Sequence, residues 1–242
     1  MKLSEIYEIP SADYKGGSDE LERFSRSIFF KNRSEAKEFP DNKEFLYAIS
    51  RQMGRIWIFA LEKTTDELIG ALSLDEEIEY PIDDKSYNVD SITTHENYRG
   101  RGIAQSLYKV ALKNPPNGLG ITLMSGHAQT PGGKRAWALF AKDPKIDITG
   151  FFAIHEAIME PELYGFDYRY DIDQLLDDLF GKIGAFEIHR HGAYIIYGFP
   201  VKFLLSKVVG EIETDLLKMY EKMPKITKGI TVKSGMFAQY KD

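Results

Sequence analysis

Residues 98–104 read Tyr-Arg-Gly-Arg-Gly-Ile-Ala, and the rest of the chain is organised around this stretch. A β-like run from Val89 to Thr94 precedes it, and a helix-like run from Gly102 to Lys113 follows it. Glycine lets a ligand approach the backbone closely, and the free N–H groups at a helix N-terminus attract anions. The helix dipole favours negative charge at the same place. The stretch therefore predicts a cradle for phosphate or pyrophosphate at a strand-to-helix junction.

The composition limits what class of protein this can be. The 242 residues, 43% of them hydrophobic, suffice for one large domain or for a core with an added segment. A net charge of −6 argues against a surface that binds nucleic acid as a whole. With no cysteine, the chain has no disulfide, thiol nucleophile or cysteine-ligated zinc. We see no signal-like N-terminal run and no apolar stretch near the ~20 residues of a membrane span, so we expect a cytoplasmic protein.

Hydrophobic periodicity predicts alternating strands and helices along the chain. Before the glycine turn we expect a strand at 3–9, a helix from Ser18 to Phe29, a helix from an Asp41/Glu44 capping box to Met53, and a hairpin of strands at 55–61 and 68–74. After it we expect a strand at 120–125, helices at 131–142 and 171–182, a strand at 148–154, a hairpin at 186–197 and a helix at 205–219. The fold is thus mixed α/β (α+β), with a mostly antiparallel central sheet flanked by helices. We expect a core domain over 1–200 and a C-terminal helical extension over 201–242 that packs on or beside it, or mediates a homodimer.

Two other phosphate-binding patterns fail, one at this stretch and one nearby at residues 128–135. The dinucleotide pattern Gly-x-Gly-x-x-Gly would start at Gly100, but Gln105 occupies its third glycine position. A P-loop would need a glycine at Ala128 and a serine or threonine at Arg135. Neither pattern is therefore supported.

A third pattern, Arg/Gln-x-x-Gly-x-Gly/Ala, is matched from Arg99 to Ala104. Together with its preceding strand, the segment 89–104 resembles the acetyl-CoA-binding segment of the GCN5-related N-acetyltransferases (GNAT family). The hairpin from Trp57 to Leu74, with Gly70, is similar to the second and third strands of that family. The resemblance runs from about 55 to 125 and more loosely to 199, and residues 124–137 are similar to some phage-encoded members.

The resemblance implies acetyl-CoA as the cofactor and assigns two groups of residues to it. The glycine turn would hold the pyrophosphate, mainly through backbone N–H groups, and would comprise Arg99, Gly100, Arg101, Gly102, Ile103 and Ala104. The end of the preceding strand, Ile92, Thr93 and Thr94, would bind the pantetheine arm in the manner of an added strand.

The catalytic groups are less defined by the family pattern. Asp90, on the strand before the turn, is the expected general base, and Glu77 and Glu79 are alternatives that would act through water. The family's usual acid is a tyrosine, but the matching positions hold Phe140 or Phe180. Three groups are left to supply the proton to the leaving thiolate: Tyr108, Ser125 or solvent.

These assignments predict an acetyl-CoA-dependent N-acetyltransferase in which an amine attacks the thioester directly. The acceptor would be a small-molecule amine or a protein lysine or N-terminus, and the acidic loop 76–84 suggests that it is cationic. The alternative is a catalytically weak or inactive protein of the same fold that binds coenzyme A or a partner protein. We expect no metal site, because His189 and His191 have no third ligand nearby in the sequence and we expect them exposed at a hairpin tip.

Overall fold

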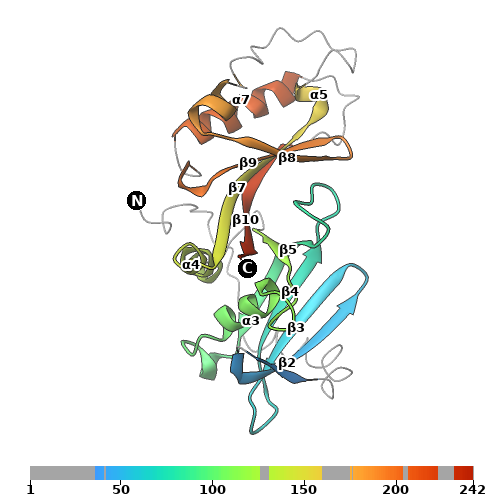
Figure 1. The fold of residues 1–242 in the computed structure, drawn as a ribbon, viewed down its shortest axis with the longest axis vertical. Coiled ribbons are helices and arrows are strands. Elements are labelled where there is room, and N and C mark those ends of the chain that lie inside the picture. The colour runs from blue at the N-terminus through green and yellow to red at the C-terminus, as the bar shows by residue number, and fades with distance from the viewer. Residues whose placement is uncertain are drawn as a thin grey trace. The chain divides into compact units, whose positions relative to one another are not determined.

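The computed structural model describes residues 36–40, 42–125, 131–159, 175, 177–203, 207–222 and 232–241. These residues fall into two compact units, and Figure 1 shows the elements of each. Unit 1 contains the described residues of 36–77, 85–147 and 238–241, and unit 2 contains those of 78–84 and 148–237. Among the described residues, no helix is both long enough and apolar enough to cross a membrane.

Unit 1 is built on a mostly antiparallel sheet, as predicted. Neighbouring strands in chain order pair antiparallel, and β6 then pairs parallel with β5. The strands are β1 (Lys37–Phe39), β2 (Asn42–Gln52), β3 (Arg55–Leu61), β4 (Leu68–Glu76), β5 (Ser86–Thr94) and β6 (Thr122–Met124). The last residues of β10 (Val232–Tyr240) lie next to β6 in the sheet. Gln239 Nε2 there donates a hydrogen bond to Thr122 Oγ1 at 3.0 Å.

Helix α3 (Ile103–Leu112) covers one face of this sheet (Figure 1). It begins after Gly102 and ends before Lys113, as the spacing of its apolar residues predicted. The buried side chains of Ile103 and Leu107 face the sheet at Gly70. Helix α4 (Pro131–Phe140) also begins where predicted, with its proline at the first helical position.

The predicted helix from Asp41 to Met53 is wrong, because this segment forms β2. Its residues pair with β3 from Leu46↔Leu61 to Gln52↔Arg55. Met53 and Gly54 have φ angles of 48° and 74°, as in a two-residue hairpin turn with positive φ at both positions. Apolar residues spaced like a helix face are also found on a strand buried on both faces, and pairing with β3 decides between the two.

Unit 2 contains the predicted hairpin and a long helix. Strand β9 (Tyr194–Pro200) pairs antiparallel with both β7 (Ile146–His155) and β8 (Phe186–His191). The other elements are α5 (Glu156–Met159), a π-helical turn (Asp177–Lys182), a 3₁₀ turn (Val201–Phe203) and α7 (Lys207–Lys222). Residues of β7, β9, α5 and α7 share one buried apolar cluster, which includes Phe152, Ile195 and Leu216.

The C-terminal segment is only partly helical. Helix α7 agrees with the prediction, but residues 232–240 form β10, which the weak pattern of that stretch did not predict. The division into domains 1–200 and 201–242 stays a prediction. The expected strand at 3–9, the helix from Ser18 and parts of 171–182 lie outside the described residues.

Candidate functional site

The glycine turn has the geometry that an anion cradle needs. Gly100 and Gly102 have φ angles of 81° and 77°, and a Cβ added to either would meet no heavy atom of the described residues within 4 Å. Gly102 is the N-cap of α3, and its carbonyl accepts the Ser106 N–H at 2.9 Å. The N–H groups of residues 102–105 therefore have no acceptor inside the helix. Free donors and open space are thus combined at the positive end of the helix dipole.

The start of α3 is held by the sheet beneath it. A Cβ on Gly70 of β4 would lie 2.6 Å from Ile103 Cγ2 and 3.3 Å from Leu107 Cδ1, so only glycine allows this close approach. The buried Tyr47 hydroxyl donates to Ser106 Oγ at 2.9 Å, and Ser106 Oγ donates to the Ile103 carbonyl at 3.0 Å. The open turn is therefore anchored to both β2 and β4.

Strand β5 parts from β6 before it reaches the cradle. Its pairing with β6 covers only Ser86–Asn88, whereas its pairing with β4 continues to Thr94↔Gly70. Among the described residues, Ile92, Thr93 and Thr94 have no strand partner on the β6 side. The predicted pantetheine-binding residues thus lie on the edge of β5 that β6 does not pair with, and this edge leads to the glycine turn.

Asp90 lies at a β-bulge on this diverging part of β5. Leu74 is opposite Val89 and Ser73 is opposite Ser91, so Asp90 is the extra residue. A bulge redirects a side chain, and bulges are common next to active sites. The Asp90 side chain is 43% exposed, and its Oδ2 is 3.9 Å from Arg55 Nη1. The predicted base is therefore accessible and lies next to a cation.

The Arg55 guanidinium is itself held firmly. It forms a two-point ion pair with Asp75, in which Arg55 Nη2 is 2.8 Å from Oδ2, and it lies 5.5 Å from the centre of the Trp57 ring. The hydrogen bond to Asp75 raises the pKa of Arg55, so the guanidinium stays charged. The sequence analysis assigned no role to Arg55 or Asp75, since pairing across β3, β4 and β5 is what brings them beside Asp90.

The two candidate acids occupy different environments. Tyr108 is 1% exposed in α3 and packs edge-to-face on Phe140 with ring centres 5.1 Å apart. Burial raises the pKa of Tyr108, so its hydroxyl keeps its proton. Ser125, also buried, directly follows Met124, the β6 residue opposite Asn88. Ser125 therefore lies where β5 and β6 part, and Tyr108 lies in the core.

The alternative bases and the histidines have structural partners. Glu77 is 8% exposed and accepts a hydrogen bond from Asn88 Nδ2, and Glu79 accepts one from the Tyr194 hydroxyl at 2.9 Å. The His189 and His191 Nε2 atoms lie 2.6 Å and 3.2 Å from backbone carbonyls of loop 78–84. His191 is exposed beside the β8–β9 turn, as expected, whereas His189 is only half-exposed, because its ring contacts this loop.

The sequence did not predict the contacts that Tyr98 makes beside the cradle. The Tyr98 hydroxyl donates to Glu67 Oε2 at 3.0 Å, and Arg101 Cζ lies 5.1 Å from the centre of the Tyr98 ring. The hydrogen bond to Glu67 raises the pKa of Tyr98. Tyr98 stands inside the quoted stretch, but no sequence pattern pointed to Glu67, which arrives from the turn between β3 and β4.

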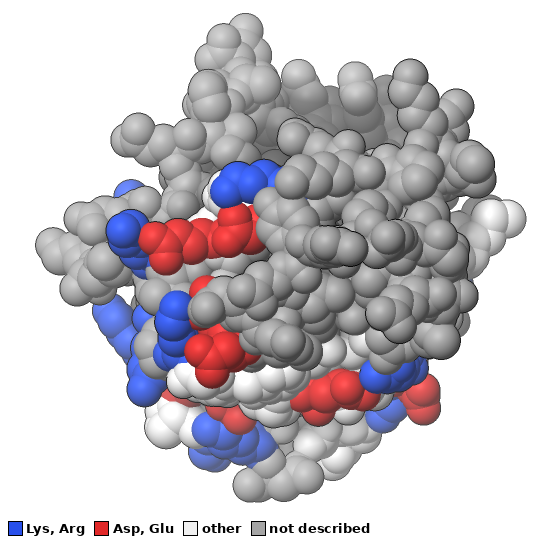
Figure 2. Space-filling view, turned by 90° about the horizontal axis from the view of Figure 1, so that it is seen from above, with Lys and Arg blue, Asp and Glu red and all other residues white. Residues whose placement is uncertain are grey.

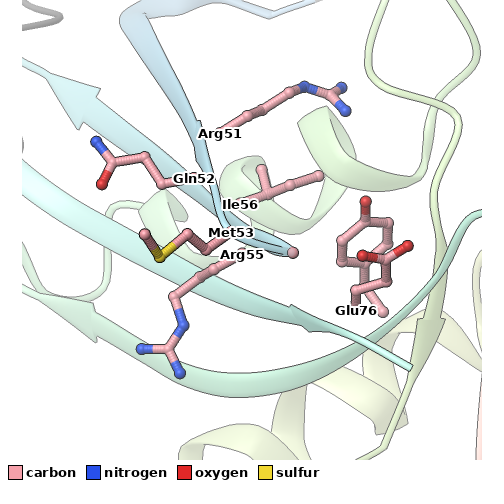
Figure 3. Close-up of a pocket in the computed structure, with 8 residues that line it drawn as sticks. Arg51, Gln52, Met53, Arg55, Ile56 and Glu76 are labelled. Atoms are coloured by element: carbon pink, nitrogen blue, oxygen red, sulfur yellow. The ribbon is translucent and has the colours of Figure 1, made fainter. Parts of the chain in front are cut away.

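A separate hollow lies at the other end of the sheet (Figure 3). It measures about 230 Å³ and is lined by the tip of the β2–β3 hairpin, Arg51–Ile56, with Glu76 and Tyr87. Tyr87 stands near the start of β5, whereas the cradle follows its end, so this hollow is not part of the cradle. On the described surface in Figure 2, lysines and arginines lie among aspartates and glutamates.

Comparisons with known proteins identify the family. Residues 5–142 match the acetyltransferase (GNAT) family, which is more than half of the chain. None of the curated proteins gives a significant match. Among solved structures, one similar region is described as a GCN5-related glucosamine N-acetyltransferase region of a fungal multi-domain GH3 beta-N-acetylglucosaminidase. It shares 14% identity at a TM-score of 0.29, and the match covers 56% of this chain and 16% of the other. The family match over residues 5–142 shows that this chain belongs to the GNAT acetyltransferase family.

Proposed function

We propose that this chain transfers the acetyl group of acetyl-CoA to an amine by direct attack of the amine on the thioester. The observation that carries the proposal is the open glycine turn at the N-terminus of α3, which comes shortly after a strand end that β6 leaves unpaired. Family membership supports acetyl transfer in general, and the two features together fit the two ends of coenzyme A.

The cofactor's pyrophosphate fits the glycine turn. Backbone N–H groups of residues 102–104 would donate to its oxygens, in space that a side chain at Gly100 or Gly102 would fill. The pantetheine arm carries amide groups, and the free edge of β5 at Ile92–Thr94 offers backbone donors and acceptors to them, as in strand addition.

The chemistry requires a base for the amine and a proton for the leaving thiolate. The amine nitrogen bonds to the carbonyl carbon, the C–S bond breaks, and the amine loses a proton to Asp90, either directly or through water. A positioned base of this kind contributes about 10²–10⁴-fold. Arg55 and Asp75 would hold Asp90 in place from the neighbouring strands.

The proton for the thiolate comes from Ser125, Tyr108 or solvent. Ser125 lies where the two strands part, which favours it over Tyr108, whose hydroxyl is in the core. The variants Ser125→Ala and Tyr108→Phe distinguish them. Only substitution of the residue that delivers the proton should lower the rate without lowering acetyl-CoA affinity.

The test combines calorimetry with acetyl-CoA and a thiol-release assay with pooled amines: spermidine, an aminoglycoside and a lysine peptide. We expect binding, and thiol release that depends on an amine. Absence of acetyl-CoA binding to the folded protein would refute the cofactor assignment. Mass spectrometry of the pooled products then identifies the acceptor.

A non-catalytic protein of the same fold is the second candidate. Its support is that both positions at which the family's tyrosine was sought hold phenylalanine: Phe140 is buried against Tyr108, and Phe180 packs on Tyr197. Acetyl-CoA binding without thiol release for any amine would favour this candidate. A cytoplasmic location, a homodimer and a phage origin stay predictions.

A further inference from the structure

We infer that Glu67, Tyr98 and Arg101 form a preorganised phosphate clamp at the rim of the glycine turn. The clamp makes Arg101, rather than Arg99, the side chain that binds a phosphate of coenzyme A. This inference rests on the proposed function, because the ligand is the acetyl donor of that reaction.

The Tyr98 ring is fixed from several sides. Its hydroxyl donates to Glu67 Oε2 at 3.0 Å, and the His95 ring packs against it edge-to-face with centres 5.7 Å apart. His95 is in turn tied to β4 by a hydrogen bond from its N–H to the Ile69 carbonyl at 2.9 Å. The ring over which Arg101 lies is therefore held in place by contacts with Glu67 and His95.

Glu67 is held by the turn between β3 and β4. The Glu62 N–H donates to the Glu67 carbonyl at 2.9 Å, and the Glu67 N–H donates to Thr65 Oγ1 at 3.3 Å. The Glu62 carboxylate accepts from the Thr64 and Thr65 N–H groups at 2.7 Å and 3.0 Å. The hydrogen bond from the Thr64 side chain is the main reason why the pKa of Glu62 is lowered. The acceptor for Tyr98 is thus built into a closed turn.

This arrangement orders Arg101 before any ligand binds. A guanidinium over an aromatic face is attracted to the ring's negative quadrupole, and a carboxylate that accepts the phenol proton increases the ring's electron density. An arginine already held in one place loses less rotamer entropy when it binds an anion. Arg101 directly precedes Gly102, the N-cap of α3, so its side chain projects from the residue next to the cradle.

Arg99 provides the natural comparison. It is exposed, it carries the same charge, and it lies on the other side of Gly100, yet its side chain makes no ion pair or ring contact with another described residue. The two arginines therefore differ in order but not in charge. Either the pyrophosphate or the 3′-phosphate of the cofactor presents paired oxygens that suit a guanidinium fork.

The test measures calorimetric affinities of coenzyme A and 3′-dephospho-coenzyme A for the full chain and its variants. We expect Arg101→Ala to weaken coenzyme A binding about tenfold or more, and Arg99→Ala to weaken it less than about threefold. Tyr98→Phe, which keeps the ring but loses the bond to Glu67, should weaken binding by about threefold. Tyr98→Leu should remove most of the contribution of Arg101, so the Tyr98→Leu/Arg101→Ala double variant should lose little more than Arg101→Ala alone.

The two ligands identify which phosphate is held. A loss on Arg101→Ala that is confined to coenzyme A assigns the 3′-phosphate, and an equal loss with both ligands assigns the pyrophosphate. Equal effects of Arg99→Ala and Arg101→Ala, or additive effects of Tyr98→Leu and Arg101→Ala, would overturn the clamp. If the wild-type chain bound neither ligand, the proposed function itself would fail. If the wild-type chain bound coenzyme A but the variants did not show the expected losses, only the clamp would fail. Thermal melts of each variant, with Tyr98→Phe as the mildest change, check that the fold is kept.

Discussion

The two ends of the diverging part of β5 are built in different ways. The cradle at one end consists of backbone: two glycines at positive φ and the unpaired N–H groups of α3. The Asp90 site at the other end consists of side chains, because a bulge and an arginine from β3 place the carboxylate. A site made of backbone leaves a local mark in the sequence, whereas a site made of side chains depends on strand register. The cradle should therefore determine cofactor binding, and the bulge should determine the rate.

Asp90→Asn is expected to show the largest difference between an effect on the reaction rate and an effect on cofactor affinity. Loss of the base should lower the rate of amine-dependent thiol release by about 10²–10⁴-fold, and acetyl-CoA affinity should change less than about twofold. Asparagine keeps the size of the side chain, so the bulge should be preserved. Steady-state rates and calorimetry on the same protein give both values.

Asp75→Asn is the matched control for this change, because Asp75 lies on the next strand and pairs with the same Arg55. It should lower the rate by less than about tenfold, since Asp75 acts through Arg55 and not on the amine. An Asp90→Asn variant with the wild-type rate would remove Asp90 from the mechanism and leave Glu77 or Glu79, acting through water, as the base.

Gly102→Glu, which acts on the cradle alone, is expected to lower cofactor affinity instead. The side chain would enter the open space at the helix N-terminus and bring a negative charge where phosphate should bind. We expect acetyl-CoA affinity to fall about 100-fold or more. Calorimetry measures the loss, and circular dichroism checks the fold.

Gly192→Glu controls for backbone strain. Gly192 has a φ of 57° and also has no heavy atom within 4 Å of an added Cβ, but it lies in the β8–β9 turn of unit 2. Both variants place an L-residue in the left-handed region, so they share the strain but not the site. Wild-type affinity in Gly102→Glu would contradict the cradle.

The same contrast explains what could be predicted from the sequence. Gly100 and Gly102 need positive φ, and α3 follows with regular apolar spacing, so the glycine turn and its helix were predicted correctly, whereas ligand binding there stays a prediction. Asp90 was predicted as a candidate, but Arg55, Asp75 and Glu67 were not, because they reach their positions only through pairing of β3, β4 and β5. Strand β2 was predicted as a helix, since residues 45–50 in its middle are buried or half-buried on both faces and alternation is lost there.

Gly70→Ala should disturb the cradle through the contact between β4 and the first residue of α3. Its Cβ would lie 2.6 Å from Ile103 Cγ2, so the first residue of α3 would have to move. We expect a loss of about 1–3 kcal/mol in the free energy of unfolding, measured by urea denaturation, and a several-fold loss of acetyl-CoA affinity. Removing the clashing methyl with Ile103→Ala in the double variant should restore part of the affinity. Additive losses would show that the close approach does not position the cradle.

The smallest effect is expected at the β2–β3 turn, where a positive φ occurs without a glycine. Met53 has a φ of 48° and its side chain is fully exposed, so its identity offers no local signal of the turn. Asparagine tolerates this conformation and precedes glycine in the commonest two-residue hairpins. Met53→Asn should therefore raise the free energy of unfolding by about 0.5–1 kcal/mol, measured by urea denaturation, without changing acetyl-CoA affinity.

Met53→Ala is the control, because it removes the same exposed side chain without easing the positive φ. It should give no gain in stability. If Met53→Asn lowered stability instead, the Met53 side chain at the hollow of Figure 3 would have to make a stabilising contact that outweighs the backbone strain. A gain confined to asparagine would show that the left-handed backbone at Met53 costs stability, at a position whose residue type, unlike the glycines of the cradle, does not reveal the positive φ.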